Sequence, residues 1–276
     1  MTLLSKYISL CVSNQTKSNL LEIARRVSFQ NICFFFILGA VSKDKPRLIE
    51  TILEQPSNNS DRKIQLLKQV VQEADSKKYW PVRMKLRFLD GMSGQSYRHV
   101  LNGILKVGSN YLEIGTWKGS TACAALDKNV LNAWIVDDWS EFGGPAKAAL
   151  KNISKFIGST RLSIISQDFK TVDYKALIPS EIDTYLFDGP HALEDHALGA
   201  KVIDSLRFQS LVFIVDDWNW QEVREGTLSG LNEIKATVVY KLEIFPCSKK
   251  RFQFSRWHNG YCFFVLENRK DLVRTR

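Results

Sequence analysis

The stretch Tyr111-Leu-Glu-Ile-Gly-Thr-Trp-Lys-Gly-Ser-Thr121 decides which fold the chain adopts. A strand-like apolar segment carries the acid Glu113 near its tip, two glycines follow, and hydroxyl residues begin a helix-like segment. Glycine lets the backbone approach a ligand closely, and the N-terminus of a helix favours a negative group. The G-x-x-x-G spacing of Gly115 and Gly119 matches neither the G-x-G-x-x-G of dinucleotide-binding proteins nor a phosphate loop. The stretch therefore predicts a strand-to-helix turn, either as a ligand-binding loop or as a plain structural turn.

Short apolar segments alternate with helix-like segments after this stretch. We expect strands over residues 111–114, 133–136, 162–165, 184–187, 211–215, 237–245 and 261–266. Helices are expected over 120–127 and over 144–157, where Pro145 is well placed at the start. Such alternation is typical of an α/β fold in which a mainly parallel sheet lies between two layers of helices. Ligands of these sheets bind beyond the carboxyl ends of the strands.

The pentapeptide Ile-Val-Asp-Asp-Trp occurs twice, at Ile135–Trp139 and at Ile214–Trp218. Both copies end an expected strand, so both aspartate pairs should face the crevice at the carboxyl ends of the strands. The flanking sequences contain no wider internal repeat. We therefore interpret the repeat as similar geometry at two strand ends, with two different tasks.

Composition excludes several classes of protein. Hydrophobic residues make up 45% and charged residues 24% of the 276, which is ordinary for a globular protein. The five cysteines are scattered, odd in number and without C-x-x-C spacing, so neither a disulfide framework nor a zinc site is indicated. A cytoplasmic protein is the expectation.

The basic excess lies in the N-terminal third. Residues 1–100 hold 16 Lys and Arg against 8 Asp and Glu, whereas the other 176 hold 22 against 21. Residues 1–80 are predicted to form a basic helical extension, with a helix over 64–74 capped by Ser60 or Asp61, ahead of a main domain over 81–276. The apolar segment Ile32–Val41 is too short for a transmembrane helix, which needs about 20 residues, and is expected to be a buried helix. The basic charge indicates either contact with an anionic surface or a solvated helical face.

The strand ends carry an ordered set of motifs. After the Gly115 loop come the first Asp-Asp pair, Gln167-Asp-Phe169, Asp188-Gly-Pro-His191 and the second Asp-Asp pair. This set resembles the class I S-adenosylmethionine (SAM)-dependent methyltransferases, over residues 90–268. The nearest branch is that of the metal-dependent O-methyltransferases, which includes catechol and macrocin (macrolide-sugar) O-methyltransferases. The resemblance implies a Rossmann-like, doubly wound, seven-stranded, mostly parallel sheet with an antiparallel last strand.

The resemblance also implies roles for individual residues. SAM would be bound by Glu113, Gly115, Thr116, Gly119, Ser120, Asp137, Asp168 and Phe169, with Asp137 on the ribose and Asp168 on the adenine. Asp188, Asp216 and Asp217 match the metal positions of the branch, and their oxygen ligands favour a hard divalent ion, Mg²⁺ first. Asp188 and His191 are the candidate catalytic groups. Two departures concern the acceptor side: Pro190 stands in the Asp-Gly-x-His turn, and Arg207–Ser210 replaces the usual Pro-Gly-Gly turn.

The expected function is therefore metal-assisted O-methylation of a hydroxyl group on a small molecule, sugar or glycan. One alternative is a non-catalytic or hydroxylase-like relative that keeps the cofactor fold. A nucleic-acid methyltransferase is a second alternative; the basic and aromatic run Lys249–Trp257 favours it, whereas the nearly neutral charge after residue 100 does not. A homo-oligomer is left open.

Overall fold

The structure is a computed structural model that describes residues 46–75, 84–105, 109–246 and 256–268. These residues belong to one compact unit, Lys43–Arg276. The other unit, Met1–Ser42, lies outside the described residues, and so does the predicted helix Ile32–Val41 within it. Across the described ranges, no helix is long and apolar enough to cross a membrane.

Strands and helices alternate along most of the described chain. The strands are β1 (Arg47–Ile52), β2 (Asn110–Ile114), β3 (Asn132–Val136), β4 (Arg161–Ile165), β5 (Thr184–Phe187), β6 (Ser210–Asp216), β7 (Thr237–Phe245) and β8 (Tyr261–Glu267). The α-helices are α4 (Asn58–Asp75), α5 (Met84–Arg87), α6 (Gln95–Ile104), α7 (Ser120–Leu126), α8 (Ala146–Ile153), α9 (Tyr174–Leu177), α10 (Leu193–Lys201) and α11 (Gln221–Glu233). Two 3-10 helices are η1 (Phe169–Thr171) and η2 (Val202–Ser205). The seven predicted strands are confirmed, each within one residue of its expected bounds.

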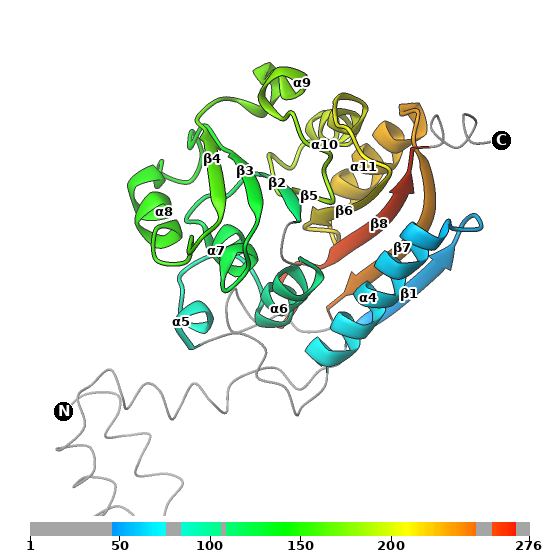
Figure 1. The fold of residues 1–276 in the computed structure, drawn as a ribbon, viewed down its shortest axis with the longest axis horizontal. Helices are drawn as coiled ribbons and strands as arrows, with labels where there is room; N and C mark the ends of the chain where they lie inside the picture. The colour runs from blue at the N-terminus through cyan, green and yellow to red at the C-terminus, as the bar shows by residue number, and fades with distance from the viewer. Residues whose placement is uncertain (1–45, 76–83, 106–108, 247–255, 269–276) are drawn as a thin grey trace, which may run out of the picture. The chain divides into compact units, whose positions relative to one another are not determined.

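The strands form one sheet in the order β1-β7-β8-β6-β5-β2-β3-β4 (Figure 1). Strands β2 to β6 pair in parallel, and β8 runs antiparallel to both of its neighbours, β6 and β7. This is the Rossmann-like α/β sheet that the sequence predicts. The chain moves outward from β2 to β4 and then returns to β5 on the other side of β2. The order therefore reverses between β2 and β5, which is where open sheets of this kind bind ligands.

Helices cover both faces of the sheet, so its central strands are apolar throughout. On β6, Val212 and Ile214 pack in one buried cluster with side chains of α4, α6 and α7. Phe213 and Val215 pack in a second cluster with side chains of α10 and α11. Successive strand residues point to opposite faces, so each face receives alternate side chains. Figure 1 shows α4 lying in front of the sheet, over β7 and β8.

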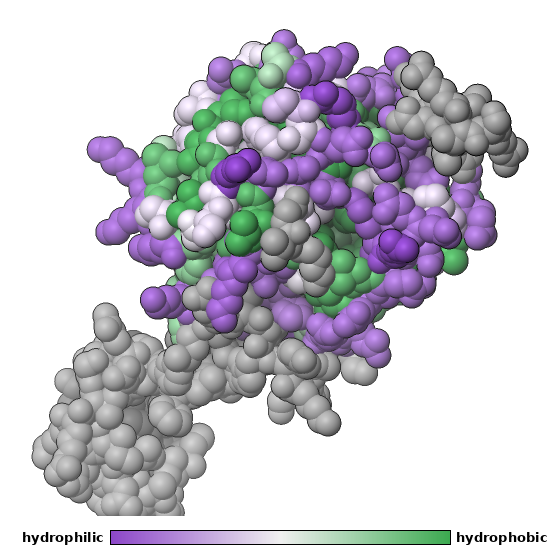
Figure 2. Space-filling view, viewed as in Figure 1, coloured by the Kyte–Doolittle hydropathy of each residue, from purple (hydrophilic) through white to green (hydrophobic). Residues whose placement is uncertain are grey.

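The outer surface mixes polar and apolar side chains. Hydrophilic residues cover much of the face seen in Figure 2, and hydrophobic ones gather in patches between them. Exposed large hydrophobic residues of the described ranges include Leu150, Ile164 and Leu198. Isolated apolar side chains of this kind are normal on the surfaces of globular proteins.

Strand β1 was not expected from the sequence. It pairs antiparallel with β7, with Arg47 opposite Phe245 and Ile52 opposite Tyr240, and it forms one edge of the sheet. The sheet of the described residues is therefore eight-stranded, not seven-stranded. The prediction of a purely helical extension over residues 1–80 is wrong for this segment.

Helix α4 is an integral part of the same domain. The helix begins at Asn58, and the hydroxyl of Ser57 accepts a hydrogen bond from the Ser60 backbone N–H at 3.4 Å, so the predicted cap at Ser60 or Asp61 is displaced. Ser60 instead bonds the Ser210 hydroxyl at 2.8 Å. Lys63 Nζ donates to the carbonyl oxygens of Ser210 and Asp183, which ties the helix to the amino ends of β5 and β6. The expected boundary at residue 80 is therefore wrong: the compact unit begins at Lys43.

A truncation series tests this boundary. A chain that starts at Lys43 should unfold cooperatively, because β1 and α4 remain in place. A chain that starts at residue 81 should not, because it loses buried residues such as Leu67 and exposes the face of the sheet that α4 covers. Removing one buried leucine costs about 2–5 kcal/mol, and this deletion removes several apolar side chains. Thermal unfolding followed by circular dichroism gives the measurement, and cooperative unfolding of the shorter chain would restore the boundary at residue 80.

Candidate functional site

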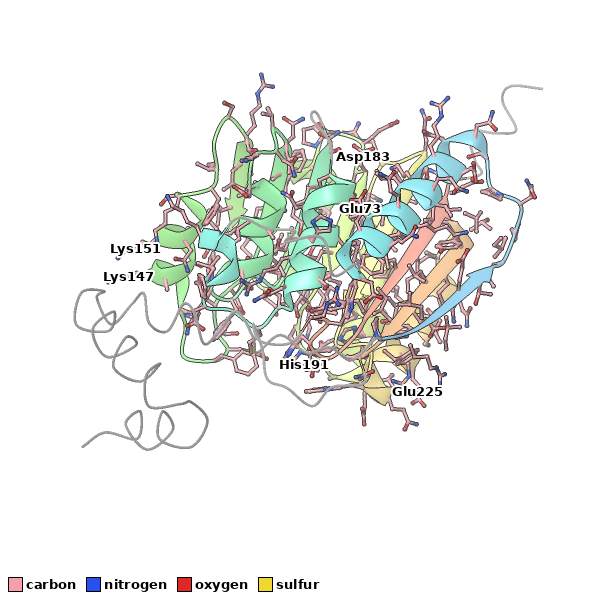
Figure 3. The ribbon with its side chains drawn as sticks, turned by 90° about the horizontal axis from the view of Figure 1, so that it is seen from below. Glu73, Lys147, Lys151, Asp183, His191 and Glu225 are labelled. Carbon is pink, nitrogen blue, oxygen red and sulfur yellow. The ribbon has the colours of Figure 1, made fainter. Side chains whose placement is uncertain are left out.

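A pocket of about 960 Å³ lies at the carboxyl ends of strands β2 to β6. In Figure 3, Asp183 and His191, which precede and follow β5, lie at opposite edges of the molecule, and the pocket is at the His191 edge. The predicted site residues that line it are Gly115, Asp137, Asp168, Phe169, Asp188, His191 and Asp217. The predicted residues that do not line it are Glu113, Thr116, Gly119, Ser120 and Asp216. The sequence therefore identified the correct edge of the sheet, but not every side chain that faces the pocket.

The glycine loop joins β2 to α7. Gly115 and Gly119 both have left-handed backbone conformations, with φ of +82° and +81°. A Cβ atom on Gly115 would lie 1.8 Å from the carbonyl oxygen of Asp188, at the end of the adjacent strand β5. Glycine is therefore required at position 115 because a side chain there would collide with the backbone at the end of β5. Gly119 lies at the N-cap of α7, where the left-handed conformation also favours glycine.

Asp137 organises the glycine loop. Its Oδ2 accepts hydrogen bonds from the backbone N–H groups of Thr116 and Trp117 at 2.7 and 2.8 Å, and its Oδ1 accepts one from Trp139 at 2.6 Å. The indole of Trp139 in turn donates to the Trp117 carbonyl oxygen at 3.0 Å. The carboxylate that the sequence assigns to a cofactor ribose thus already joins the loops that follow β2 and β3. The next residue, Asp138, is exposed and also lines the pocket.

Glu113 lies beneath the loop, in the layer between the sheet and α7. Its side chain is fully buried and accepts hydrogen bonds from the hydroxyls of Tyr111 and Thr121, both at 2.7 Å. Burial raises the pKa of Glu113 to about 7, against the opposing effect of these hydrogen bonds. Glu113 therefore supports the loop from below, and the expected direct contact with a ligand is not available to it.

The third strand end supplies Asp168 and Phe169. Asp168 is exposed and caps η1, because its Oδ1 accepts the Lys170 backbone N–H at 3.0 Å. The Phe169 ring is nearly buried and packs edge-on against Phe187. The ammonium of Lys170 pairs with Asp195 of α10 at 2.5 Å, across this end of the pocket. The expected pair of an acid and an aromatic ring is therefore present at this strand end.

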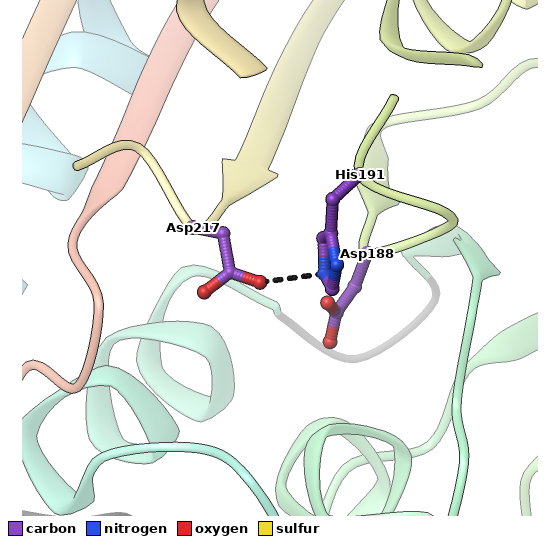
Figure 4. A group of neighbouring side chains, drawn as sticks. All are labelled: Asp188, His191 and Asp217. Carbon is purple, nitrogen blue, oxygen red and sulfur yellow. Dashed lines mark ion pairs between the residues drawn. The ribbon is translucent and has the colours of Figure 1, made fainter. Parts of the chain in front are cut away.

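Asp188, His191 and Asp217 form a cluster in which one potential ligand atom from each lies within 4.8 Å of the others. Figure 4 shows the three side chains together, with a dashed line for the ion pair between His191 and Asp217. His191 Nε2 pairs with Asp217 Oδ2 at 2.8 Å, and Asp217 Oδ1 accepts the Asn259 amide at 2.6 Å. The hydrogen bond to Asp217 raises the pKa of His191. Within the described part of the chain, the carboxylate of Asp188 has no hydrogen-bond or ion-pair partner.

Asp216, which was predicted as a metal ligand, does not belong to this cluster, whereas His191, which was predicted as a catalytic group, does. Alternation along β6 sends Asp216 to the same face as Val212 and Ile214, where it is 2% exposed. Its Oδ1 accepts the Asp217 backbone N–H at 2.6 Å. Asp217 leaves the strand with a left-handed φ of +56°, which turns its side chain towards the pocket. Two adjacent acids at a strand end therefore point in different directions.

Residues with strained backbone conformations cluster around the pocket. Six non-glycine residues of the described ranges have left-handed φ angles, and five of them line it: Trp117, Trp139, Phe142, Asp217 and His258. Such conformations cost about 1–3 kcal/mol each and cluster at functional sites. Trp117, Trp139 and Phe142 were not predicted as site residues, although Trp117 and Trp139 lie within motifs that the sequence analysis identified. Trp220, which lies 4.7 Å from the His191 ring, was missed as well.

The pocket is strongly acidic. Seven carboxyl groups line it, namely those of Asp137, Asp138, Glu141, Asp168, Asp188, Asp195 and Asp217. Lys170 is the one lysine among the described lining residues, and it is paired with Asp195. Burial, and then the charges of Asp216 and Asp217, raise the pKa of Asp188 well above the ordinary carboxyl value. A cation in the pocket would relieve this repulsion.

Comparisons with known proteins give similar folds only. No protein-family model matches the chain, and no curated protein matches it. TrmN from Thermus thermophilus is 13% identical with a TM-score of 0.46, and the match covers 67% of this chain and 52% of that one. A provisionally assigned RNA methyltransferase from Pyrococcus horikoshii is 16% identical with a TM-score of 0.42, over 75% and 97% of the two chains.

A third structure, of a provisionally assigned methyltransferase in complex with S-adenosylhomocysteine (SAH), is 13% identical with a TM-score of 0.44, over 63% of this chain and 48% of that one. The match thus spans about half the length of the first and third of these proteins. Similarity of this extent concerns the backbone and does not assign a substrate to this chain.

Proposed function

We propose that this protein is a SAM-dependent methyltransferase whose acceptor is a hydroxyl group on a small molecule. The observation that carries the proposal is the backbone contact between Gly115 and Asp188 at the point where the strand order reverses. This contact puts the glycine loop, with Asp137, Asp168 and Phe169 beyond it, beside the cluster of Asp188, His191 and Asp217 in one pocket. A methyl donor bound on the loop side would then face an acceptor bound at the cluster.

The chemistry follows from this arrangement. The acceptor oxygen attacks the methyl carbon of SAM, the O–CH₃ bond forms as the S–CH₃ bond breaks, and SAH leaves. The hydroxyl proton passes to the ionised carboxylate of Asp188, which has no hydrogen-bond or ion-pair partner among the described residues. Asp217 holds His191 in one orientation through the 2.8 Å pair, so the imidazole can position the acceptor. In-line alignment supplies much of the rate in such a reaction.

The cluster also fits a divalent cation. Asp188, His191 and Asp217 would hold it, and the chemistry of two carboxylates and one imidazole suits Mn²⁺ as well as the Mg²⁺ expected from an all-carboxylate set. A cation at this place would lower the pKa of an acceptor hydroxyl. Metal dependence belongs to the proposal, because the carboxylates of Asp188 and Asp217 lie close together and would repel each other unless a positive charge compensated them.

The acceptor is proposed to be a small molecule and not RNA. The carboxyl groups that line the pocket would repel a phosphate-bearing acceptor, whereas SAM itself brings a sulfonium cation. The exposed ring of Trp220 beside His191 provides a flat surface for an uncharged acceptor. These features support the expected small-molecule acceptor over the nucleic-acid alternative.

Calorimetry with SAH, alone and with Mg²⁺ or Mn²⁺, tests the proposal. We expect SAH to bind the wild-type protein, and we expect a divalent cation to be required for turnover in a panel of hydroxylated small molecules. Glu225→Gln should bind SAH and turn over as the wild type does, since Glu225 is exposed on α11 and does not line the pocket. Absence of SAH binding would overturn the methyltransferase proposal. Methylation of RNA but of no small molecule would contradict the proposed small-molecule acceptor. Unchanged turnover in excess chelator would contradict the proposed requirement for a metal ion.

A further inference from the structure

A fully buried arginine lies behind the pocket. Arg98 of α6 is 0% exposed, and its guanidinium donates hydrogen bonds to backbone carbonyl oxygens of the preceding segment. These acceptors are the carbonyls of Leu86, Leu89 at 3.0 Å and Gly91 at 3.4 Å. Arg98 Nε also donates to the Ser93 hydroxyl at 2.8 Å. One side chain therefore holds most of the segment that leads into α6.

No carboxylate forms an ion pair with Arg98 within the described ranges. Asp90, the nearest acid in sequence, pairs with Lys118 at 2.6 Å instead. Burial lowers the pKa of Arg98 to about 10, so the guanidinium is still charged at neutral pH. A buried charge is costly unless its donors find acceptors, and here three backbone carbonyls and one hydroxyl accept four hydrogen bonds from the guanidinium. The arrangement is thus specific for the shape and five donors of a guanidinium.

The segment Leu89–Ser93, which we name the strap, is in direct contact with Ser120, the first residue of α7 after the glycine loop. The hydroxyls of Ser93 and Ser120 lie 2.8 Å apart. A Cβ atom on Gly91 would lie 2.2 Å from the Cβ of Ser120, so the strap fits here only with glycine at this position. Between these two contacts, Met92 is the strap residue that lines the pocket.

We propose that Arg98 is a positioning residue of the methyl-transfer site, which holds the strap against the glycine loop so that Met92 forms the pocket wall beside the cofactor. This inference rests on the proposed function, and it adds a residue that touches neither cofactor nor acceptor. Arg98 acts through Ser93 and Gly91 on the first turn of α7, and through Met92 on the space that the cofactor occupies. The thioether of Met92 is apolar and adaptable, which suits a wall that must exclude water from the reacting methyl group.

Arg98→Lys is the main test, with Asn102→Ala as the matched control. Asn102 lies one turn further along α6, and its side chain also donates to two backbone carbonyls, those of Ala124 and Asp127, but it does not line the pocket. Both variants should lose stability. Arg98→Lys should also weaken SAH binding by at least about tenfold, because small misplacements of a binding group have large effects. Met92→Ala should reproduce the loss of affinity without the loss of stability.

Hydrogen exchange at the backbone amides of residues 116–120 provides a readout that needs no cofactor. These amides should exchange faster in Arg98→Lys and in Ser93→Ala than in the wild type, and at unchanged rates in Asn102→Ala. If Arg98→Lys does not fold, Ser93→Ala carries the same test. Unchanged exchange, or equal loss of SAH affinity in Arg98→Lys and Asn102→Ala, would overturn the inference. Faster exchange in a protein that does not bind SAH would overturn the proposed function and leave the positioning role supported.

Discussion

Gly115→Ala is expected to abolish measurable SAH binding, whereas Gly143→Ala should leave binding nearly unchanged. Both glycines have left-handed backbone conformations, with φ of +82° and +84°. Each substitution therefore carries the same backbone cost, about 1–2 kcal/mol. A Cβ atom at Gly143 meets nothing within 4 Å, but one at Gly115 lies 1.8 Å from the Asp188 carbonyl oxygen. The difference between the two variants isolates the contact between the ends of β2 and β5.

The methyl group at Gly115 must displace backbone, because no flexible side chain can move aside. The glycine loop and the cluster at Asp188 would then separate, and a shift of about 1 Å in a binding group can cost about 10²-fold. Calorimetry with SAH and thermal unfolding should be measured on both variants. Equal SAH affinity in Gly115→Ala and wild type would contradict the position of the cofactor on this loop. Equal losses in the two glycine variants would mean that backbone strain alone is responsible.

Asp188→Asn is expected to reduce turnover by about 10²–10⁴-fold, the range typical of a lost general base. SAH binding should stay within a few-fold of wild type, because the amide keeps the size of the side chain and the contact with Gly115 uses the Asp188 backbone. The control is Asp216→Asn. Asp216 is buried and does not line the pocket, and an amide oxygen can still accept the Asp217 backbone N–H, although loss of the Asp216 charge also removes one cause of the raised pKa of Asp188. Turnover of this variant should stay within about tenfold of wild type.

The two asparagine variants distinguish between two hypotheses: the cluster seen in the structure, and the metal-binding residues implied by the resemblance. That set requires the carboxylates of Asp188 and Asp216, with an oxygen ligand from Asp217, so it predicts loss of activity in both variants. The cluster of Asp188, His191 and Asp217 predicts loss in one only. Single-turnover kinetics at saturating SAM, with Mg²⁺ or Mn²⁺ present, provide the comparison. Full activity of Asp188→Asn would exclude Asp188 as the proton acceptor.

Much of the fold was predictable from local patterns. The strands that follow residue 109 are short apolar segments separated by helix-like ones, and their bounds agree closely with those observed. Parallel strands bring their carboxyl ends to one edge, so the sequence also indicated where Gly115, Asp137, Asp168, Asp188 and Asp217 meet. These features depend on residues near one another in the chain, which is why periodicity and turn residues determine them.

The directions of individual side chains were decided by the tertiary structure. Sequence motifs gave Asp216 and Asp217 the same role, but strand alternation buries one and a left-handed turn exposes the other to the pocket. Glu113 and Asp137 were expected to bind a ligand directly. The hydrogen bond with Thr121 of α7 makes Glu113 a buried support. Asp137 lines the pocket, and it also links two loops by accepting hydrogen bonds from the loop amides.

At the N-terminal boundary of the domain, local sequence again predicted one feature, a helix, and long-range contacts decided another, its place in the domain. The sequence alone determined the helix that became α4, because its apolar residues recur with helical spacing. Only the tertiary structure joined it to the domain, through pairs such as Arg47 with Phe245 and Lys63 with Ser210. Neither partner of such a pair carries a local signal for the other, since strand pairing and burial depend on the packing of the whole sheet. For the same reason, the buried guanidinium of Arg98 could be read from the sequence only as one more charge on a basic segment.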